Sequence, residues 1–280
     1  MKTLVYQIEA ITNLQVGNGE INMGVVDNLI QRDAATGMPN IHASSLKGAL
    51  REHCIHLIKP EFIRHIFGSS PDELDVREAG NFRFFNADLL SMPVRSDKAP
   101  FLMATCPLLV NDYLTKRELF GLPVTETEMQ EVKNILQQAQ KGVPVVVCSP
   151  QQGAYIEDLD RKAVFIGEKF DTSLFTSWVG SPAVLLHDED FSMLCDDDHL
   201  PVMARNNLTK GRENLWYEQV LPRFSRLYFF VLASEAENCL QAYQKAIKNK
   251  LVQIGANATV GYGYCLLTRG DEYIQKREEL

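Results

Sequence analysis

Apolar positions along the chain recur with the two periods that distinguish strands from helices. Alternation in Thr3–Ile11 and Asn81–Asp88 predicts strands, and the apolar runs Val143–Cys148 and Leu227–Leu232 predict buried ones. Helical spacing begins after Ser44, which has the character of an N-cap. The single apolar face of that helix would be formed by Leu46, Ala49, Leu50, Cys54 and Leu57.

Capping signals predict two further helices. Thr125 and Glu128 have the spacing of a capping box, ahead of an apolar stripe that ends near Gly142. Ser234 and Glu237 repeat the same spacing before a second stripe. Both pairs therefore mark expected helix starts.

Two long segments are predicted to be irregular. Ser91–Pro107 contains three prolines and is expected to be a loop or an edge segment with exposed charge. Ser149–Leu200 is acid-rich and is expected to be an insertion into the main fold. Within it, Phe165–Trp178 is predicted to form a hairpin.

The order of the elements favours an α+β fold. Helices alternate with strands but without the short, repeated βα rhythm of a doubly wound sheet. We therefore predict antiparallel strands in a ferredoxin-like βαββαβ core. The length of 280 residues admits one large domain or two ordinary ones.

Composition places the chain among globular proteins of a reducing compartment. Hydrophobic residues make up 45% and charged residues 23%, and no apolar run is long enough to cross a bilayer. The first residues lack a signal-peptide core, so we expect a cytoplasmic protein. The six cysteines are dispersed without a CxxC pair, which predicts free, buried thiols instead of disulfides or a zinc site.

The net charge of −8 argues against a generic nucleic-acid-binding protein, whose binding surface is usually basic. The charges are unevenly distributed, however. Basic residues gather at Lys47 and Arg51 and again in Arg205–Arg212, while acidic residues concentrate elsewhere. A basic face on an acidic protein can still bind a phosphate backbone.

The start of the helix in Ile41–His53 has the wrong charge for an isolated helix. Its first turns carry cations where acidic residues would complement the helix dipole. Gly48 lowers helix stability, which is easier to explain if a ligand must approach the backbone at this position. These features predict a phosphate-binding site, although an ordinary solvated helix with a serine cap is equally compatible. The side chains of this site would be Ser44, Ser45, Lys47 and Arg51.

Asp27 is a second candidate functional residue. It lies between the apolar pairs Val25-Val26 and Leu29-Ile30, so its carboxylate must be solvated, paired or functional. By itself, a lone aspartate in a loop is more often a turn former or an ion-pair partner, here of Arg32.

Two segments near the C-terminal end have nucleic-acid-binding character. Gly255–Gly263 lacks the Walker pattern, and it fails the dinucleotide fingerprint because Tyr264–Thr268 continues as a strand. A glycine-rich nest that receives a phosphate or a base remains open. Asn206–Glu218 is polar and basic, and Trp216 within it could stack on a base or belong to the core.

Five segments together resemble the RAMP superfamily of CRISPR RNA-guided complexes, most closely the repeated backbone subunit of the type III-B (Cmr) effector. In chain order they are VGNGEINMGVVDNLIQRD, SSLKGALRE, FFNADLLSMPVRS, NLWYEQVLP and IGANATVGYG. They occur in the family's order and span most of the sequence. Thr115–Leu200 contributes little to the resemblance.

The resemblance implies a fold and a set of partners. The expected fold is a modified ferredoxin-like palm, similar to an RNA-recognition motif, in a single domain over residues 1–280. Its inserted thumb hairpin would lie in Ser149–Leu200. The implied partners are a CRISPR guide RNA, a target RNA, further copies of the chain and other Cmr subunits, without a membrane.

The resemblance also implies a reaction. The aspartate of the family's VVD segment is required for cutting target RNA, and it corresponds to Asp27. The expected chemistry is attack by a ribose 2′-hydroxyl, dependent on a divalent metal such as Mg²⁺ or Mn²⁺ that Asp27 would hold. Glu218 is a second acidic candidate. Gln15 stands where the family often has histidine, so a histidine base is not expected.

RNA contacts implied by the resemblance and by the local chemistry are Ser44, Ser45, Lys47, Arg51, Gly255, Asn257, Thr259, Gly261 and Gly263. Such contacts would position RNA, while base pairing reads its sequence. Three alternatives stay open. The chain could be a guide-binding subunit without nuclease activity, an endoribonuclease that processes the precursor transcript, or an enzyme for a small phosphorylated ligand.

Overall fold

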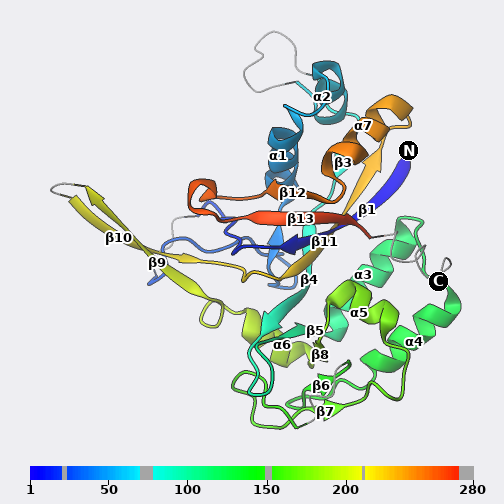
Figure 1. Cartoon of the computed structure of the whole chain (residues 1–280), viewed down its shortest axis with the longest axis vertical. Coiled ribbons are helices and arrows are strands. Elements are labelled where there is room, and N and C mark those ends of the chain that lie inside the picture. Colours follow the sequence, from blue (N-terminus) through cyan, green and yellow to red (C-terminus); the bar gives the residue numbers. More distant parts are fainter. Residues whose placement is uncertain (21–23, 70–77, 149–152, 210–211, 271–280) are drawn as a thin grey trace. The chain divides into compact units, whose positions relative to one another are not determined.

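The computed structural model describes the chain except for residues 21–23, 70–77, 149–152, 210–211 and 271–280 (Figure 1). The chain divides into two compact units. Unit 1 comprises Met1–Asp88, Pro201–Arg223 and Tyr228–Arg269. Unit 2 comprises Leu89–Leu200, Phe224–Leu227 and the C-terminal residues from Gly270. Since each unit is assembled from separate stretches, neither is a contiguous domain, and a single domain over residues 1–280 stays a prediction.

Unit 1 is built on a sheet whose long strands come from both ends of the chain. In sheet order the strands are β12 (Lys250–Gln253), β13 (Tyr264–Arg269), β1 (Lys2–Ala10) and β11 (Arg226–Ala233). β1 runs antiparallel to β13, with Tyr6 opposite Arg269 and Ala10 opposite Cys265. The predicted strands at both ends of the sequence are therefore confirmed.

Three helices pack against this part of the sheet. They are α1 (Ala43–Cys54), α2 (Pro60–Phe67) and α7 (Glu237–Ile247), which contact one another. The buried ring of Tyr243 on α7 meets Tyr6 edge-on at 6.2 Å and Phe82 at 5.5 Å, and Tyr6 stacks on Phe229 at 5.3 Å. Burial raises the pKa of the Tyr243 phenol well above its ordinary value. This aromatic cluster is the centre of the unit 1 core.

Helix α1 begins earlier and ends earlier than predicted. Its N-cap is His42, which gives no side-chain cap, so the prediction that Ser44 caps the helix is wrong. The first N–H group, that of Ala43, instead donates to Asn86 Oδ1 at 2.9 Å. Leu57 lies beyond the end of α1 and is 56% exposed, whereas the rest of the predicted apolar face is buried or half-buried. Only the ends of the expected face differ.

The other two capping predictions have opposite outcomes. The box at Thr125 is confirmed: its Oγ1 accepts from the Glu128 N–H at 3.2 Å, and Glu128 Oε2 accepts from the Thr125 N–H at 2.9 Å. The box at Ser234 is wrong, because the N-cap of α7 is Ala236 and it has no side-chain cap.

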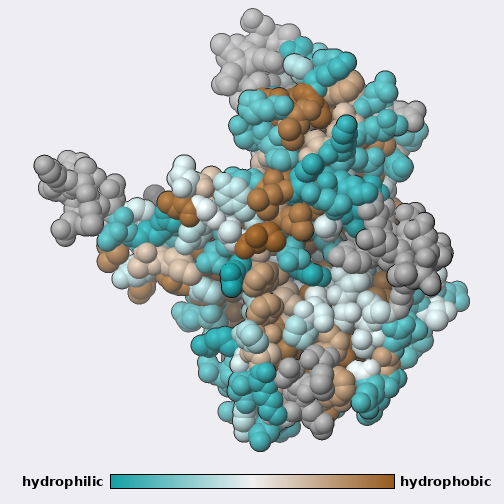
Figure 2. Space-filling model, viewed as in Figure 1, coloured by the Kyte–Doolittle hydropathy of each residue, from teal (hydrophilic) through white to brown (hydrophobic). Residues whose placement is uncertain are grey.

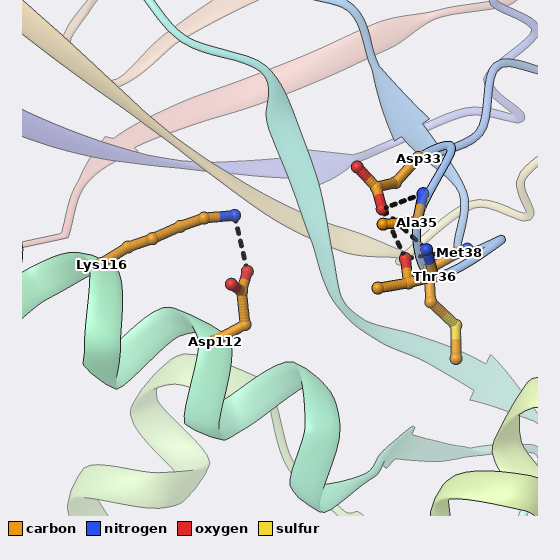
Figure 3. Close-up of polar contacts among 6 residues, drawn as sticks. All are labelled: Asp33, Ala35, Thr36, Met38, Asp112 and Lys116. Carbon is orange, nitrogen blue, oxygen red and sulfur yellow. Dashed lines mark hydrogen bonds and ion pairs between the residues drawn. The ribbon is translucent and has the colours of Figure 1, made fainter.

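Unit 2 has its own row of strands. In sheet order they are β4 (Ala87–Val94), β5 (Leu102–Thr105), β8 (Ala183–Leu185), β6 (Val145–Val146) and β7 (Val164–Phe165). Its helices are α3 (Pro107–Leu119), α4 (Glu126–Leu136), α5 (Ser173–Val179) and α6 (Asp188–Cys195). On α3, Lys116 and Asp112 form an ion pair of 2.6 Å one turn apart (Figure 3).

The prediction that Ser91–Pro107 is a loop or an edge segment is wrong, although its charged residues Arg95 and Lys98 are exposed as expected. β4 and β5 are paired antiparallel strands of that segment, with Pro93 opposite Met103. Apolar side chains of the segment are buried, and Ser91 Oγ donates to the Val179 carbonyl at 2.6 Å. Burial therefore outweighs the proline signal here.

The predicted hairpin within Ser149–Leu200 is also in the wrong place. Phe165–Trp178 contains the end of β7 and most of α5, whose Phe175 and Trp178 are buried. A long antiparallel pair follows that segment instead, formed by β9 (Val202–Thr209) and β10 (Arg212–Gln219), and we call it the β9–β10 hairpin. They make a separate two-stranded antiparallel sheet that projects from the other strands of unit 1 (Figure 1).

Other expectations from composition agree with the structure. All six cysteines are free, and all but Cys148 are buried. Across the part of the chain that the structure describes, no helix combines the length and the apolar character needed to span a bilayer.

Candidate functional site

Asp27 lies beside a short ribbon within unit 1. Gly17 pairs with Ile30, the Asn18 N–H donates to the Leu29 carbonyl at 3.0 Å, and the Gln31 N–H donates to the Val16 carbonyl at 2.9 Å. The side chain of Gln15 covers position 17, where a Cβ would lie 3.3 Å from Gln15 Nε2. The ribbon brings Asp27 to the base of the β9–β10 hairpin.

Asp27 both donates a hydrogen bond to the hairpin strand β10 and accepts one from it. The N–H groups of Asp27 and Asn28 both donate to the Tyr217 carbonyl, at 3.0 and 3.1 Å. In return, the Tyr217 N–H donates to Asp27 Oδ2 at 2.7 Å. The side chain is exposed, and its Oδ1 has no partner among the described residues. The structure thus fixes the carboxylate through one oxygen and leaves the other open; an ion pair with Arg32 is not formed.

Glu218 has a very different setting, although it neighbours Tyr217. It is only 6% exposed, and both of its carboxylate oxygens are engaged. Oε1 accepts from the Trp216 indole N–H at 2.8 Å, and Oε2 accepts from the Asn257 side-chain amide at 2.7 Å. Arg205 Nε lies 3.8 Å from Oε2. Trp216 itself is half-buried and is anchored by its N–H group.

The glycine-rich loop lies between β12 and β13. It holds a 3₁₀ turn, Ala258–Val260, and four residues with positive φ, namely Gly255, Asn257, Gly261 and Gly263. Its ends are tied to the segment after β1, because Ala256 N–H donates to the Gln15 carbonyl at 2.8 Å and Gly263 N–H to the Asn13 carbonyl at 2.9 Å.

Only part of the glycine loop can act as an anion-binding nest. The N–H groups from Val260 to Gly263 donate to carbonyls of the chain itself. Those of Asn257, Ala258 and Thr259 find no acceptor within the residues that the structure describes. The Asn257 side chain is already bound to Glu218, so an RNA contact there would use its backbone.

Gln31 connects the Asp27 segment to the start of α1. Its buried amide donates to Ser45 Oγ at 3.0 Å and to the Gly17 carbonyl at 3.1 Å. Its oxygen accepts from the His42 N–H at 2.7 Å. The predicted phosphate site at this helix and Asp27 therefore belong to one bonded framework. No sequence signal marked Gln31 for this role.

A tight loop follows Gln31 and leads to the start of α1. Asp33 Oδ1 accepts from the N–H groups of Ala35 and Thr36 and from Thr36 Oγ1, which closes a tight loop (Figure 3). The loop returns Pro39 to pair with Arg32, whose Nη1 donates to the Gly37 carbonyl at 2.9 Å. α1 follows three residues after Asn40.

The predicted phosphate-binding side chains divide between two settings. Ser44 is exposed and Lys47 is half-buried, and within the described chain neither has a charged or hydrogen-bonding side-chain partner. Ser45 is held by Gln31. Arg51 Nη1 donates to the Ser69 carbonyl at 3.0 Å and lines a separate hollow beside α2. Lys47 is thus the cation left available near the helix start.

The donor set suits a metal shared with a substrate better than a metal held by protein alone. Among the described residues there is no group of three or more His, Cys, Asp or Glu side chains placed to hold an ion. Mg²⁺ is commonly bound through one or two carboxylates together with substrate phosphates and water. The open Oδ1 of Asp27 fits that mode, whereas the oxygens of Glu218 are already used.

The β9–β10 hairpin offers a mixed surface. Leu215 on β10 is 58% exposed and Val202 on β9 is 39% exposed. Hydrophilic and apolar residues are interspersed on the visible face of this part of the molecule (Figure 2). Exposed apolar side chains on a projecting ribbon provide surface that a binding partner can bury.

Comparisons with known proteins agree on one family. The model of the RAMP superfamily matches residues 7–265. The CRISPR system Cmr endoribonuclease Cmr4 of Pyrococcus furiosus is 28% identical over 284 residues, which cover 96% of this chain and 96% of that protein.

Solved structures show the same mixed α+β fold. A chain in the cryo-EM structure of the type III-B Cmr-beta bound to cognate target RNA has a TM-score of 0.79 at 22% identity, with 98% of this chain and 99% of that chain covered. Oligomeric Cmr4 from Pyrococcus furiosus has a TM-score of 0.66 at 21% identity, with coverages of 96% and 98%.

Proposed function

Because the chain belongs to the RAMP superfamily, we propose that it is a backbone subunit of a type III-B CRISPR ribonucleoprotein in antiviral defence. It binds guide RNA as one of several copies and cleaves complementary target RNA. The observation that carries this proposal is Asp27, which is fixed at the base of the hairpin with one carboxylate oxygen open. The relative from Pyrococcus furiosus, named an endoribonuclease, supports it.

The finer fold assignment is a modified ferredoxin-like palm. The strand order β13-β1-β11 corresponds to strands 4, 1 and 3 of that fold. α1 lies between β1 and β4 in the sequence, and α7 lies between β11 and β13. Both helices occupy the positions that a βαββαβ core requires.

We assign the thumb of this subunit to the β9–β10 hairpin, in place of the Ser149–Leu200 segment expected from the sequence. A projecting ribbon can separate paired strands and splay the target backbone. In an A-form duplex the 2′-hydroxyl is not in line with the scissile bond of its own phosphodiester. Local distortion of the target strand would bring the two into line. Because Asp27 is bonded to Tyr217 on β10, its carboxylate moves with the thumb base.

Asp27 serves the reaction by orienting the attacking group. The 2′-oxygen forms a bond to phosphorus as the bond to the 5′-oxygen breaks. The hydroxyl proton passes to water, and water returns a proton to the leaving 5′-oxygen. The products are a 2′,3′-cyclic phosphate and a 5′-hydroxyl. Asp27 Oδ1 would hold a divalent metal, Mg²⁺ or Mn²⁺, which supplies charge stabilisation at the phosphate. Gln15 lacks a titratable group and cannot act as the base.

Guide RNA would be held by the start of α1 and by the glycine loop. Ser44, Lys47 and Arg51 follow one side of α1 by their helical spacing. The open N–H groups of the glycine loop add donors for phosphate. These contacts are independent of base identity, so pairing with the guide selects the target.

The test is cleavage by the complex reconstituted with guide RNA and its partner subunits. We expect a complementary RNA to be cut at regular intervals into products with 2′,3′-cyclic ends. A single 2′-deoxynucleotide at one cut position should abolish that cut and leave the others. The all-ribose target is the matched control.

Three results would contradict the proposal. Cutting at the deoxy position would exclude attack by the 2′-hydroxyl. An assembled complex that binds target without cutting it would leave the chain as a structural guide-binding subunit. Cleavage of repeat RNA by the isolated chain would instead identify a processing enzyme.

A further inference from the structure

A cluster around the buried Glu218 joins the glycine loop to the base of the hairpin. We call it the carboxylate clamp: Arg205 on β9, Trp216 and Glu218 on β10, and Asn257 in the glycine loop. Glu218 is its centre and accepts from Trp216 Nε1 at 2.8 Å and from Asn257 Nδ2 at 2.7 Å. The Arg205 guanidinium lies 3.8 Å from Glu218 Oε2 and covers the Tyr262 ring at 5.3 Å.

The clamp is a satisfied network. A buried carboxylate is costly unless donors and a cation compensate it, and here each oxygen has a donor and Arg205 supplies the charge. Glu218 is also only 6% exposed, so a metal or a proton would have to reach it past the donors that already surround it. The network is therefore suited to holding two segments together.

The clamp also fixes β10, the strand to which Asp27 is hydrogen-bonded. Glu218 pairs with Asn28 in a parallel bridge, and the Gln219 N–H donates to the Asn28 carbonyl at 2.9 Å. Tyr217, immediately before Glu218, makes three hydrogen bonds with Asp27 and Asn28. A shift of β10 relative to the glycine loop would therefore displace the Asp27 carboxylate.

We propose that Glu218 is a positioning residue: its carboxylate locks the glycine loop to the hairpin base and thereby holds Asp27 in place, without taking a proton or binding metal. This inference rests on the proposed cleavage of target RNA. It assigns different roles to the two acidic candidates. Asp27 contacts the reacting atoms, and Glu218 holds Asp27 in position.

A reversed pair separates this role from a catalytic one. Glu218→Gln removes the carboxylate and places an amide N–H₂ against the Asn257 N–H₂. Asn257→Asp places a second carboxylate against that of Glu218. In the double variant, the new amide at position 218 donates to the new carboxylate at position 257, while Trp216 still donates to the side-chain oxygen at position 218. Asn257 has φ +63°, a conformation that aspartate also adopts, so the backbone is kept.

The readout is the single-turnover cleavage rate of target RNA by complexes with equal guide content. We expect the rate of each single variant to fall between about tenfold and a hundredfold, the usual effect of a small misplacement of reacting groups. The double variant should recover most of that loss. Asn257→Gly, which keeps the backbone and removes only the loop's side chain, should resemble the single variants.

Two outcomes overturn the inference. A double variant as slow as Glu218→Gln would mean that position 218 needs its own carboxylate. Because the Asn257 amide can turn its oxygen toward an amide at position 218, full activity in both Glu218→Gln and Asn257→Gly would mean that the clamp is dispensable. Should Glu218→Gln not fold, Asn257→Gly decides: cleavage at the wild-type rate contradicts the clamp.

A second readout is independent of cleavage. Amide hydrogen exchange in the free subunit should quicken in the glycine loop, at Val260 to Gly263, in each single variant and slow again in the double variant. If the wild-type complex does not cut RNA, the proposed function fails while this exchange pattern still reports the clamp. Unchanged exchange in all variants would overturn the clamp itself.

Discussion

The close packing of the glycine loop predicts very different tolerance at two of its glycines. Gly255 has φ +86°, and a Cβ there would lie 2.3 Å from the Gln15 carbonyl oxygen and 2.9 Å from Val16 Cγ2. Gly261 has nearly the same φ, +84°, but a Cβ there meets nothing within 4 Å. Alanine at these two positions thus shares the backbone strain and differs in the clash.

The magnitudes follow from these two terms. Placing alanine in the left-handed region costs about 1–2 kcal/mol. The contact with Gln15 is with the main chain, which cannot rotate away, and forced shifts of this kind cost about 1–3 kcal/mol more. Gly255→Ala should therefore lower the free energy of unfolding by about 2–5 kcal/mol and Gly261→Ala by about 1–2 kcal/mol.

Urea denaturation followed by far-UV circular dichroism measures both values on the free subunit. The difference between the two variants is the informative quantity, because the strain common to both cancels. Equal losses for the two variants would refute the described packing of Gly255 on Gln15. A loss below about 1 kcal/mol for Gly255→Ala would refute the positive φ as well.

Three further predictions concern α1, its cations and the buried thiols. Gly48→Ala, which meets nothing within 4 Å, should stabilise the free subunit by about 0.5–1 kcal/mol in urea denaturation, and weaker guide-RNA binding by this variant would show that RNA approaches the helix backbone. Lys47→Ala should weaken guide binding in a salt-dependent manner more than Glu52→Ala on the same helix, and equal binding by both would remove Lys47 from the RNA site. Burial raises the pKa of Cys54 and of Cys265 to about 12, so the unfolded chain releases these protons first. The stability that these two thiols contribute is complete below their ordinary pKa of 9.0 and is lost as the pH rises from there toward 12. The free energy of unfolding should therefore fall less steeply between about pH 9 and about pH 10.5 in Cys54→Ala than in the wild type. Parallel curves for the two proteins would contradict this.

Local signals in the sequence predicted the elements that are stabilised locally. The capping box at Thr125 depends on residues three apart. β1 was recognised from its own run of strand-forming residues, five of which are buried in succession at positions 4–8. The start of α1 was misplaced because its cap comes from Asn86, far along the chain. The β9–β10 hairpin was missed because Asn206–Glu218 lacks the apolar alternation that a half-buried strand requires.

The geometry of the site depends on hydrogen bonds between residues far apart in the chain, which the sequence alone could not predict. Asp27 was a candidate from its apolar neighbours and from the family resemblance, but its attachment to Tyr217 spans 190 positions. The division of labour between Asp27 and Glu218 became visible only with Trp216 and Asn257 in place. Residue type alone does not distinguish an open carboxylate from a saturated one.

The most direct test of the account is cleavage by a complex that carries Asp27→Asn. The asparagine oxygen can still accept from the Tyr217 N–H, so the local structure is kept while the charge is removed. Glu20→Gln, a neighbouring exposed acid, is the matched control. We expect Asp27→Asn to assemble and bind target like the wild type while all regular cuts fall by at least about a hundredfold. Regular cutting at the wild-type rate would contradict the central claim.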